Sequence, residues 1–365
     1  MLSSLPKLAD RSFIIGFFLP SLLFCLAVLV TSRDHPAVEQ LVEKLAAKDI
    51  GNGVFVLVGV WVSGVVMLVI NHPLYRFLEG YTWPLSKLEA ARERYRRRLR
   101  RAKAEVRTLA QRWAKAGDSF PEAELKRYQR VQSTVLARLP SRESDVMPTA
   151  FGNAIKAFEI YPRDVYGADG PTVWLRLVSV MPKTYLDQIQ DVRSQIDFLI
   201  NCCFLSGLLA LVELADALSK RPARQFVVDA LTGSIASTSG LPWVQLTCSG
   251  LACIMAFGCY LWAVSRVPAW GQVVMSGFDC YLPALAAQLG FSLPRTGVER
   301  EAFWTALSQM LIYRRDPYGD LPFRPEEWPQ AVSKAEEGGK PRQTGVDYRE
   351  KRGDVAEDAT PDDEI

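Results

Sequence analysis

The stretch "VFVLVGVWVSGVVMLVI", Val54 to Ile70, contains no charged side chain, and its one hydroxyl belongs to Ser63. A helix rises about 1.5 Å per residue, so this run is long enough to cross most of a hydrocarbon core of about 30 Å. A helix in a soluble protein ordinarily keeps a polar face over such a length. The pattern therefore predicts a membrane-spanning helix at residues 54–70 and disfavours a buried helix in a soluble core.

Three other runs are similarly apolar, at residues 12–31, 196–218 and 244–265. Hydrophobic residues make up 49% of the 365-residue chain and are concentrated in these runs, while the rest is rich in charge. Such segregation is typical of a chain that lies partly in lipid and partly in water. The sequence disfavours a cleaved signal peptide at residues 12–31, because no obvious small-x-small site precedes a secreted domain. We expect an all-α polytopic membrane protein with four transmembrane helices.

The distribution of Lys and Arg predicts the orientation of these helices. Residues 71–195 carry 23 Lys/Arg against 14 Asp/Glu, whereas the connections at 32–53 and 219–243 carry three basic residues each. Basic residues near membrane ends favour the cytoplasmic side. We therefore expect residues 71–195 to form a cytoplasmic helical domain. Both termini should then be cytoplasmic, in a multi-pass protein of the bacterial plasma (inner) membrane.

A strongly basic segment, "ARERYRRRLRRAKAEVR", follows the second crossing at residues 91–107 and holds nine Lys/Arg. Each basic residue near an anionic leaflet adds roughly 1 kcal/mol of attraction. A lipid bilayer with an anionic inner leaflet is therefore the favoured partner, and a protein partner is the alternative. Nucleic acid is disfavoured, because no zinc spacing, RNP motif or groove-reading module is visible.

The basic segment also carries an apolar seam with alternating steps of three and four residues, which is typical of a coiled coil. The seam consists of Leu88, Tyr95, Leu99, Ala102, Val106, Leu109 and Trp113. Gly117 can end this helix, and a second amphipathic helix follows. We expect a helical hairpin at residues 85–139. The seam can close within one chain or between copies, so a homo-oligomer or a protein partner bound through residues 88–139 is expected.

A compact region at residues 147–182, which includes "MPTAFGNAIKAFEIYPRDVYGADG", combines aromatic and charged side chains. The favoured interpretation is a network of ion pairs and helix caps that fixes a tight loop. The alternative is a surface for a ligand or partner. The residues concerned are Glu159, Arg163, Asp164, Asp169 and Arg176. We also expect one helix to run from Lys183 without a break into the third crossing.

The segment "NHPLYRFLEGYTWP" leaves the second crossing at Asn71 and predicts an elbow at the membrane surface. Tyr and Trp are enriched at membrane–water interfaces. Arg76 and Glu79 are three residues apart on a helix and can pair, and Gly80 with Pro84 can turn the chain. A lipid or ligand site here is the alternative.

The sequence contains no recognisable catalytic or metal-binding motif. The two histidines, His35 and His72, fall on opposite predicted sides of the membrane, and the seven cysteines form no CxxC. No P-loop, GxSxG or dinucleotide fingerprint is present. We therefore expect neither an enzyme nor a bound cofactor or metal.

Polar residues inside the third predicted crossing are costly in lipid. Asp197 and Asn201 share a face near its inner end, and Glu213 lies near its outer end. The favoured role is hydrogen bonding between helices together with snorkelling at both interfaces. The alternative is an acidic lining for a cation path.

Residues 266–315, after the fourth crossing, are predicted to form cytoplasmic amphipathic helices. One helix should end at Gly290, and the next should be capped by Thr296 and Glu299. Its expected inner face consists of Phe303, Trp304, Leu307, Leu311 and Ile312. Residues 328–365 are polar and end in "EDATPDDEI", so we expect a disordered acidic tail.

Several segments together resemble a loose group of uncharacterised bacterial four-crossing membrane proteins. They are the elbow, the "PTAFGN" and "YPRDVYGAD" motifs, "SGFDCYLPALAAQLG" and the "EREAFW" helix. The resemblance covers most of residues 10–315 and implies a shared architecture without an assigned chemistry. We expect a scaffold or sensor whose cytoplasmic domain binds a partner, or itself, at the inner leaflet. The alternative is an oligomeric ion channel or a membrane-permeabilising effector, for example in a defence system.

Overall fold

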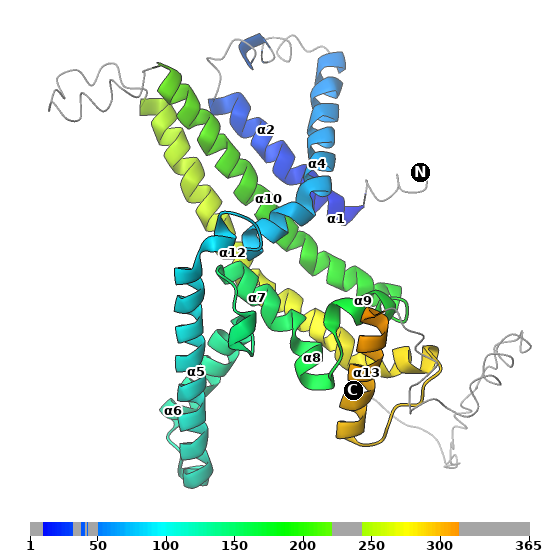
Figure 1. Ribbon diagram of the computed structural model, residues 1–365. Coiled ribbons are helices and arrows are strands. Elements are labelled where there is room, and N and C mark those ends of the chain that lie inside the picture. Colours follow the sequence, from blue (N-terminus) through cyan, green and yellow to red (C-terminus); the bar gives the residue numbers. More distant parts are fainter. Residues whose placement is uncertain (1–9, 32–37, 41, 43–49, 221–242, 314–365) are drawn as a thin grey trace, which may run out of the picture.

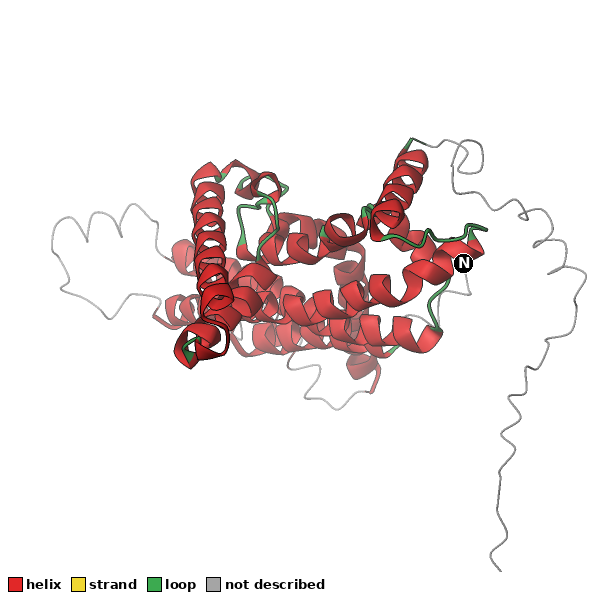
Figure 2. Ribbon diagram, turned by 90° about the horizontal axis from the view of Figure 1, so that it is seen from below, coloured by secondary structure: helices red, strands yellow, loops and turns green. Residues whose placement is uncertain are grey.

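The computed structural model describes residues 10–31, 38–40, 42, 50–220 and 243–313, and these residues form helices joined by short turns (Figures 1 and 2). No strand occurs among the described residues. The prediction of an all-α protein is therefore confirmed. The predicted acidic tail, residues 328–365, lies outside the described part of the chain.

Four helical segments of the described chain are long and apolar enough to cross a membrane, as predicted. The first combines three short elements, and the other three are single helices. They are α1 (Arg11–Phe13) with the π-helix η2 (Ile14–Phe18) and α2 (Leu19–Thr31), then α4 (Ile50–Glu79), α10 (Lys183–Lys220) and α12 (Trp243–Gln288).

The π-helical turn in the first segment has a cause in the sequence. Pro20 lacks a backbone N–H, so it cannot donate the α-helical hydrogen bond to the carbonyl of Gly16, four residues earlier. The side-chain amide of Asn201 on α10 donates to this carbonyl at 2.7 Å. The break in the helix is therefore bridged by a contact with another candidate span.

The second span continues beyond the predicted end at Ile70 and stops at Glu79. Pro73 lies inside α4, and Figure 1 shows that this helix changes direction along its length. A proline inside a helix ordinarily causes such a bend, because its ring clashes with the preceding turn. The bend brings the polar end of α4 against α10.

The third span is part of a longer helix that begins at Lys183, as expected from the sequence. One continuous helix therefore connects the lower part of the molecule in Figure 1 with the apolar part above it. Ile196 and Ile200 of this helix are fully buried.

The fourth span departs from the prediction of a crossing followed by a separate helix. The single helix α12 runs from Trp243 to Gln288 and includes Pro268 and Pro283. These prolines do not end the helix, because its buried face packs against α10 and the neighbouring short helices along most of its length. Prolines are tolerated in such helices where neighbouring groups compensate for the missing backbone hydrogen bond.

A helical arm follows the elbow and projects from the body of the molecule (Figure 1). After the 3₁₀ turn η3 (Leu85–Lys87) it consists of two antiparallel layers. The first is α5 (Glu89–Ala116), and the return layer is the 3₁₀ turn η4 (Gly117–Ser119), α6 (Glu122–Arg130), the π-helix η5 (Val131–Val135) and the 3₁₀ turn η6 (Leu136–Arg138). The predicted hairpin is present, with a less regular second layer than expected.

The coiled-coil seam of the arm closes within the chain. Leu99 is 1% exposed and packs against Leu139 and Val146, which follow the return layer in the chain. The ring of Trp113 lies 5.8 Å from that of Tyr128. Of the two possibilities left open by the sequence, the described chain therefore uses this seam internally.

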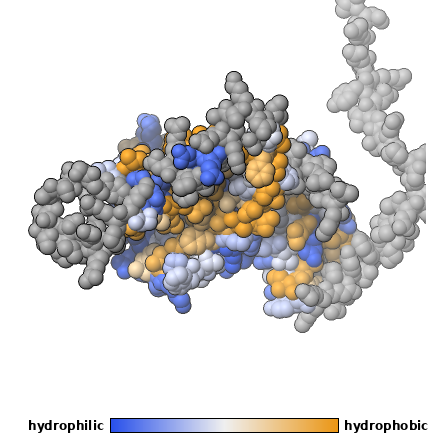
Figure 3. All heavy atoms as spheres, turned by 90° about the horizontal axis from the view of Figure 1, so that it is seen from above, coloured by the Kyte–Doolittle hydropathy of each residue, from blue (hydrophilic) through white to orange (hydrophobic). Residues whose placement is uncertain are grey.

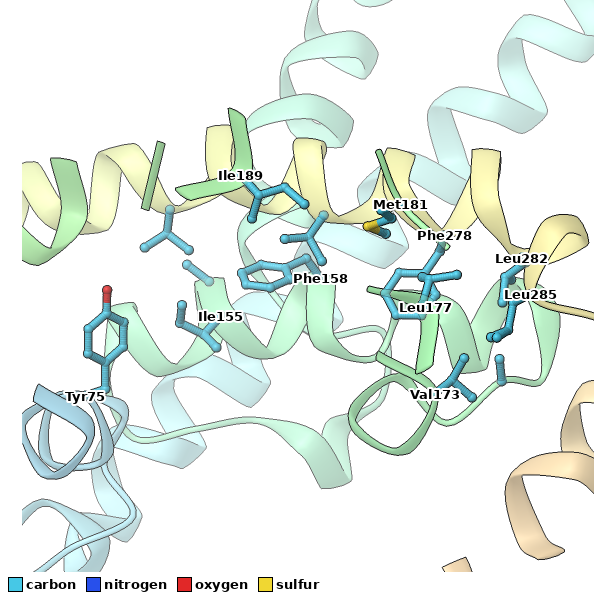
Figure 4. Packing of buried hydrophobic residues seen from close by; sticks show 14 of the residues in the cluster. Tyr75, Ile155, Phe158, Val173, Leu177, Met181, Ile189, Phe278, Leu282 and Leu285 are labelled. Atoms are coloured by element: carbon cyan, nitrogen blue, oxygen red, sulfur yellow. The ribbon is translucent and has the colours of Figure 1, made fainter. Parts of the chain in front are cut away.

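Short helices cover the lower halves of α10 and α12 and complete the main core. They are the 3₁₀ turn η7 (Glu143–Asp145), α7 (Ala150–Glu159), α8 (Tyr161–Tyr166), α9 (Gly170–Leu177) and α13 (Gly297–Ile312). Figure 4 shows side chains from the short and the long helices directed into one apolar layer, including Phe158 of α7, Leu177 of α9, and Phe278 and Leu285 of α12. Burial of this layer fixes the short helices to the two long ones.

The last described helix, α13, begins as predicted, because the Thr296 hydroxyl accepts a hydrogen bond from the Glu299 N–H at 3.3 Å. Phe303, Trp304 and Leu307 are fully buried. The expectation that Ile312 faces the core is wrong, since its side chain is exposed. Ile312 is the final helical residue, where the chain leaves the core.

The candidate spans expose much of their apolar surface. Large side chains such as Val30, Phe55 and Ile254 are more than two-thirds exposed. Figure 3, which views the end of the molecule where these spans terminate, shows a largely apolar surface between small polar patches and grey atoms. An apolar surface of this extent is what a lipid environment accommodates.

Candidate functional site

A buried polar cluster lies where α4 and α10 meet, and the carboxylate of Asp197 is its centre. Asp197 is 2% exposed. Its Oδ1 accepts hydrogen bonds from the Asn71 amide at 3.0 Å and from the Tyr75 hydroxyl at 2.8 Å. Oδ2 lies 3.8 Å from Nε of Arg193, one turn earlier on α10. A charge inside a membrane-spanning region requires such partners.

A close approach of the first span positions this cluster. A Cβ atom added at Gly16 would lie only 3.2 Å from Cβ of Asp197. Glycine at this position therefore lets η2 pack directly over the carboxylate. Asn201, one turn beyond Asp197, holds the same segment by donating to the Gly16 carbonyl. Three candidate spans consequently meet at one polar site.

Two acceptors near this site have no hydrogen-bond partner. They are the side-chain oxygens Oδ1 of Asn71 and of Asn201, and both are buried. In each amide the nitrogen is already used, for Asp197 and for Gly16 respectively. Buried polar atoms are rarely left unpaired. These two oxygens can therefore each accept one further hydrogen bond.

Glu213, the third polar residue singled out in this span, does not join the cluster. It is 2% exposed and lies about four turns further along α10. Asp197 and Asn201 therefore lie on one face of α10, as predicted. Glu213 occupies a separate buried position.

The charged residues of the compact region form ion pairs and caps. Arg163 contacts the Asp145 carboxylate at 2.6 Å, and Asp164 accepts a hydrogen bond from Ser141 and lies 3.4 Å from Arg142. These contacts tie α8 to the segment that returns from the arm.

The remaining charged residues of this region have similarly local contacts. Asp169 caps α9 by accepting from the Thr172 N–H at 3.1 Å, and Arg176 donates to the Thr172 carbonyl at 2.8 Å. Glu159 pairs with Lys156 at 3.2 Å. The five residues do not converge on one point, and Glu159 lines a cavity of about 400 Å³.

The elbow is present, but its expected ion pair is not. Arg76 does not pair with Glu79, and its guanidinium instead lies 3.6 Å from the centre of the Tyr81 ring. The Glu79 carbonyl accepts from the Thr149 hydroxyl at 3.2 Å. The reason is the turn at Gly80, where φ is +88°, which folds Tyr81 back over Arg76.

A basic face on α5 is the second notable feature of the described chain. Arg94, Arg97, Arg98 and Arg101 line a concave surface of about 1020 Å³ next to Pro148. Among the described residues, only Arg97 of these four arginines has an acidic partner, Glu93 at 3.2 Å. The other arginines of the arm's upper part, such as Arg92 and Arg96, pair with Glu89. Arg94, Arg98 and Arg101 therefore have no acidic partner among the described residues, although Glu93 also lines this surface.

The sequence alone did not identify every member of these sites. Asn71 and Arg193 were not singled out, and Tyr75 was expected only as an aromatic residue of the elbow at the membrane–water interface, although all three lie beside Asp197. Their spacing offers a partial signal, because Asn71 and Tyr75 are four residues apart on one helix face. Within the described residues no group of three or more His, Cys, Asp or Glu side chains could hold a metal ion.

The geometry therefore consists of a hydrogen-bonded carboxylate between membrane-spanning candidates and an arm with an unpaired basic face. Comparison with known proteins assigns neither feature, since no protein-family model, curated protein or solved structure matches this chain.

Proposed function

We propose that this chain is a multi-pass protein of the bacterial inner membrane that acts as a scaffold or sensor. Its helical arm binds an anionic partner at the cytoplasmic side. The four candidate spans support the membrane location, and the excess of Lys and Arg in residues 71–195 supports the orientation.

The observation that carries this proposal is the unpaired basic face of α5. Arg94, Arg98 and Arg101 have no acidic partner in the described chain, although Glu89 and Glu93 lie on the same helix and pair with its other arginines. Because Leu99, Ala102 and Leu109 of the apolar seam are already buried within the arm, an external partner would meet this charged face. Charge complementarity of this kind chiefly provides specificity and fast association.

The long helices support a sensing role. α10 and α12 each run unbroken from the core of short helices into a candidate span. A displacement of that core would therefore be transmitted along rigid elements. The cluster at Asp197 would hold the spans in one register while the arm is free or occupied.

A photoreactive amino acid placed at Arg98 tests the proposed arm contact in native membranes. Position 96 is the matched control, because Arg96 pairs with Glu89. We expect a discrete protein adduct from position 98 and none from position 96. Replacement of Arg94, Arg97 and Arg101 by Gln should abolish the adduct. An unchanged adduct in that triple variant, or equal adducts from both positions, would refute the proposal.

The proposed orientation has its own test. A cysteine at position 98 should react with a membrane-impermeant thiol reagent only after the cells are opened. Since Cys253 and Cys280 are also exposed, the readout is labelling of the arm peptide by mass spectrometry. Labelling of that peptide in intact cells would show that the arm lies outside the cell and would contradict the proposed orientation.

An oligomeric ion channel is the second candidate, and the buried carboxylates of Asp197 and Glu213 in α10 favour it. In one chain Asp197 is enclosed by donors, so a path would have to form between copies. Liposome flux that changes in an Asp197→Asn variant would favour the channel. Absence of flux from a folded, oligomeric sample would exclude the channel function.

A further inference from the structure

A cavity of about 400 Å³ lies between the lower halves of α10 and α12 and the short helices α7 and α9. Its body is apolar, with walls formed by Phe158, Trp174, Leu186, Ile189, Val274 and Phe278. Figure 4 shows Phe158, Ile189 and Phe278 approaching this region from three different helices. Its volume falls within the range of pockets for small molecules, roughly 300–1,000 Å³.

Unused hydrogen-bond donors lie at one part of the cavity wall. Trp270 lines the cavity, and its indole Nε1–H is buried without an acceptor. The indole nitrogen can only donate. A buried donor that has no acceptor among the described residues is costly. Less than 1 Å² of this nitrogen is accessible, so an occupant of the cavity would have to displace the indole ring to supply the missing acceptor.

Arg193 adds a positive charge to the same wall. Its guanidinium lies 5.9 Å from the centre of the Trp270 ring. Its nearest carboxylate oxygen, on Asp197, is 3.8 Å away, which is too long for a hydrogen bond. A guanidinium has five N–H donors arranged for planar oxyanions. The acidic residue on the wall, Glu159, is already paired with Lys156.

We infer that this cavity binds an amphipathic anion, with a carboxylate or phosphate head at Arg193 and Trp270 and a hydrocarbon body among the apolar walls. The inference does not depend on the arm contact proposed above. Such a molecule can come from the inner leaflet or from the aqueous phase, and both sources share the same head-and-tail chemistry.

The test uses the full-length protein in nanodiscs and a diazirine analogue of dodecanoic acid as a photoreactive probe. We expect labelling of the peptides containing Leu186–Arg193 and Trp270–Phe278. Unlabelled dodecanoate should displace the probe at least about tenfold better than dodecanol or acetate, because the pocket offers both donors and apolar walls. Equal displacement by dodecanol, or labelling confined to other peptides, would overturn the inference.

Two further arms distinguish the sources of the ligand. Monoacyl phosphatidic acid incorporated into the nanodisc tests a leaflet lipid, and dodecanoate added to the buffer tests a soluble ligand. Displacement by either supports the shared chemistry, and the more effective one identifies the source. Displacement by neither contradicts the inference.

Variants test the two polar contacts separately. Trp270→Phe retains the aromatic packing against Phe158, whose ring centre is 5.0 Å away, and should weaken probe binding about threefold to tenfold. Arg193→Gln should weaken it at least about tenfold, and Arg193→Lys should restore part of the loss. Arg266→Gln is the matched control, because Arg266 is an exposed arginine of α12 outside the cavity.

A cavity-filling variant addresses binding without altering charge. Val274→Trp places a large ring in the apolar body of the cavity and should abolish labelling. Thermal unfolding of each variant establishes that it is folded, and Trp270→Phe remains decisive if Arg193→Gln destabilises the cluster at Asp197. Wild-type labelling in both Trp270→Phe and Val274→Trp would exclude this cavity as the binding site.

Discussion

The hydroxyl of Tyr75 on α4 donates a 2.8 Å hydrogen bond to Oδ1 of Asp197 on α10, joining residues 122 positions apart in the sequence. The same oxygen accepts from Asn71, one helical turn before Tyr75. Two donors from α4 thus bind a single carboxylate oxygen of α10. Because the contact is buried, it fixes the register of the two helices more specifically than apolar packing does.

Replacement of Tyr75 by Phe should destabilise the protein by about 1 kcal/mol, since hydrogen bonds between membrane-spanning helices contribute on that scale. Asp197→Ala should cost more, because it leaves Asn71 and Tyr75 without their acceptor. Thermal unfolding in detergent measures both effects. Tyr281→Phe is the control for loss of a hydroxyl, since Tyr281 packs at the side of the core. An effect of Asp197→Ala no larger than that of Tyr281→Phe would contradict this account.

The contact between the elbow and α7 depends on a glycine. A Cβ atom at Gly152 would lie 2.2 Å from the carbonyl oxygen of Glu79, which is a backbone atom and has little freedom to move. We expect Gly152→Ala to destabilise the protein by roughly 1–3 kcal/mol, as overpacking does. Gly250→Ala is the matched control on α12, where an added Cβ meets nothing within 4 Å. Equal melting temperatures for the two variants would contradict the close packing.

The arm should depend on its internal seam. Leu99 is 1% exposed, so Leu99→Ala should cost roughly 2–5 kcal/mol of local stability and increase hydrogen exchange throughout α5 and α6. Leu88 belongs to the same predicted seam but is 45% exposed, so Leu88→Ala should have little effect. Similar exchange in the two variants would indicate that the seam closes between copies.

The sequence predicted the long apolar helices well, because lipid requires continuous apolar surface. The helix from Lys183 into the third crossing also follows from local pattern, since no proline or glycine interrupts its first turns. The prediction differs from the structure after the fourth crossing, where the sequence placed a separate amphipathic helix from residue 266, and Pro268 lies inside the observed helix. The structure continues α12 through this residue because tertiary packing outweighs the local cost of proline.

The partners of Asp197 were harder to predict from sequence. A carboxylate in an apolar run signals a buried polar contact, but Asn71 and Arg193 become its neighbours only through the packing of α4 on α10. Similarly, Arg76 and Glu79 have spacing that favours an ion pair. The turn at Gly80 instead places an aromatic ring over the guanidinium. Local spacing indicates which contacts are feasible, and the tertiary fold selects among them.

A pair of tyrosines connects α8 to α12 through a shared acceptor. Tyr161 and Tyr166 both donate to Oδ1 of Asp279, at 2.8 and 2.7 Å. Burial raises the pKa of both phenols, and the hydrogen bond to Asp279 raises the pKa further. The hydroxyls therefore remain protonated at a pH where a free tyrosine, with a pKa of about 10, begins to ionise.

This arrangement predicts a loss of stability at alkaline pH. The folded state holds these protons more tightly than the unfolded state, so the contribution is complete below pH about 10 and is lost as the pH rises through the raised pKa values. The melting temperature of the wild type should consequently fall more steeply between about pH 9.5 and 11 than that of a Tyr161→Phe/Tyr166→Phe double variant. The comparison cancels the titration of the other tyrosines and lysines, which both proteins share. Tyr313→Phe, which removes an exposed tyrosine, should retain the wild-type slope. Parallel slopes for the wild type and the double variant would show that the link between α8 and α12 does not depend on these protons.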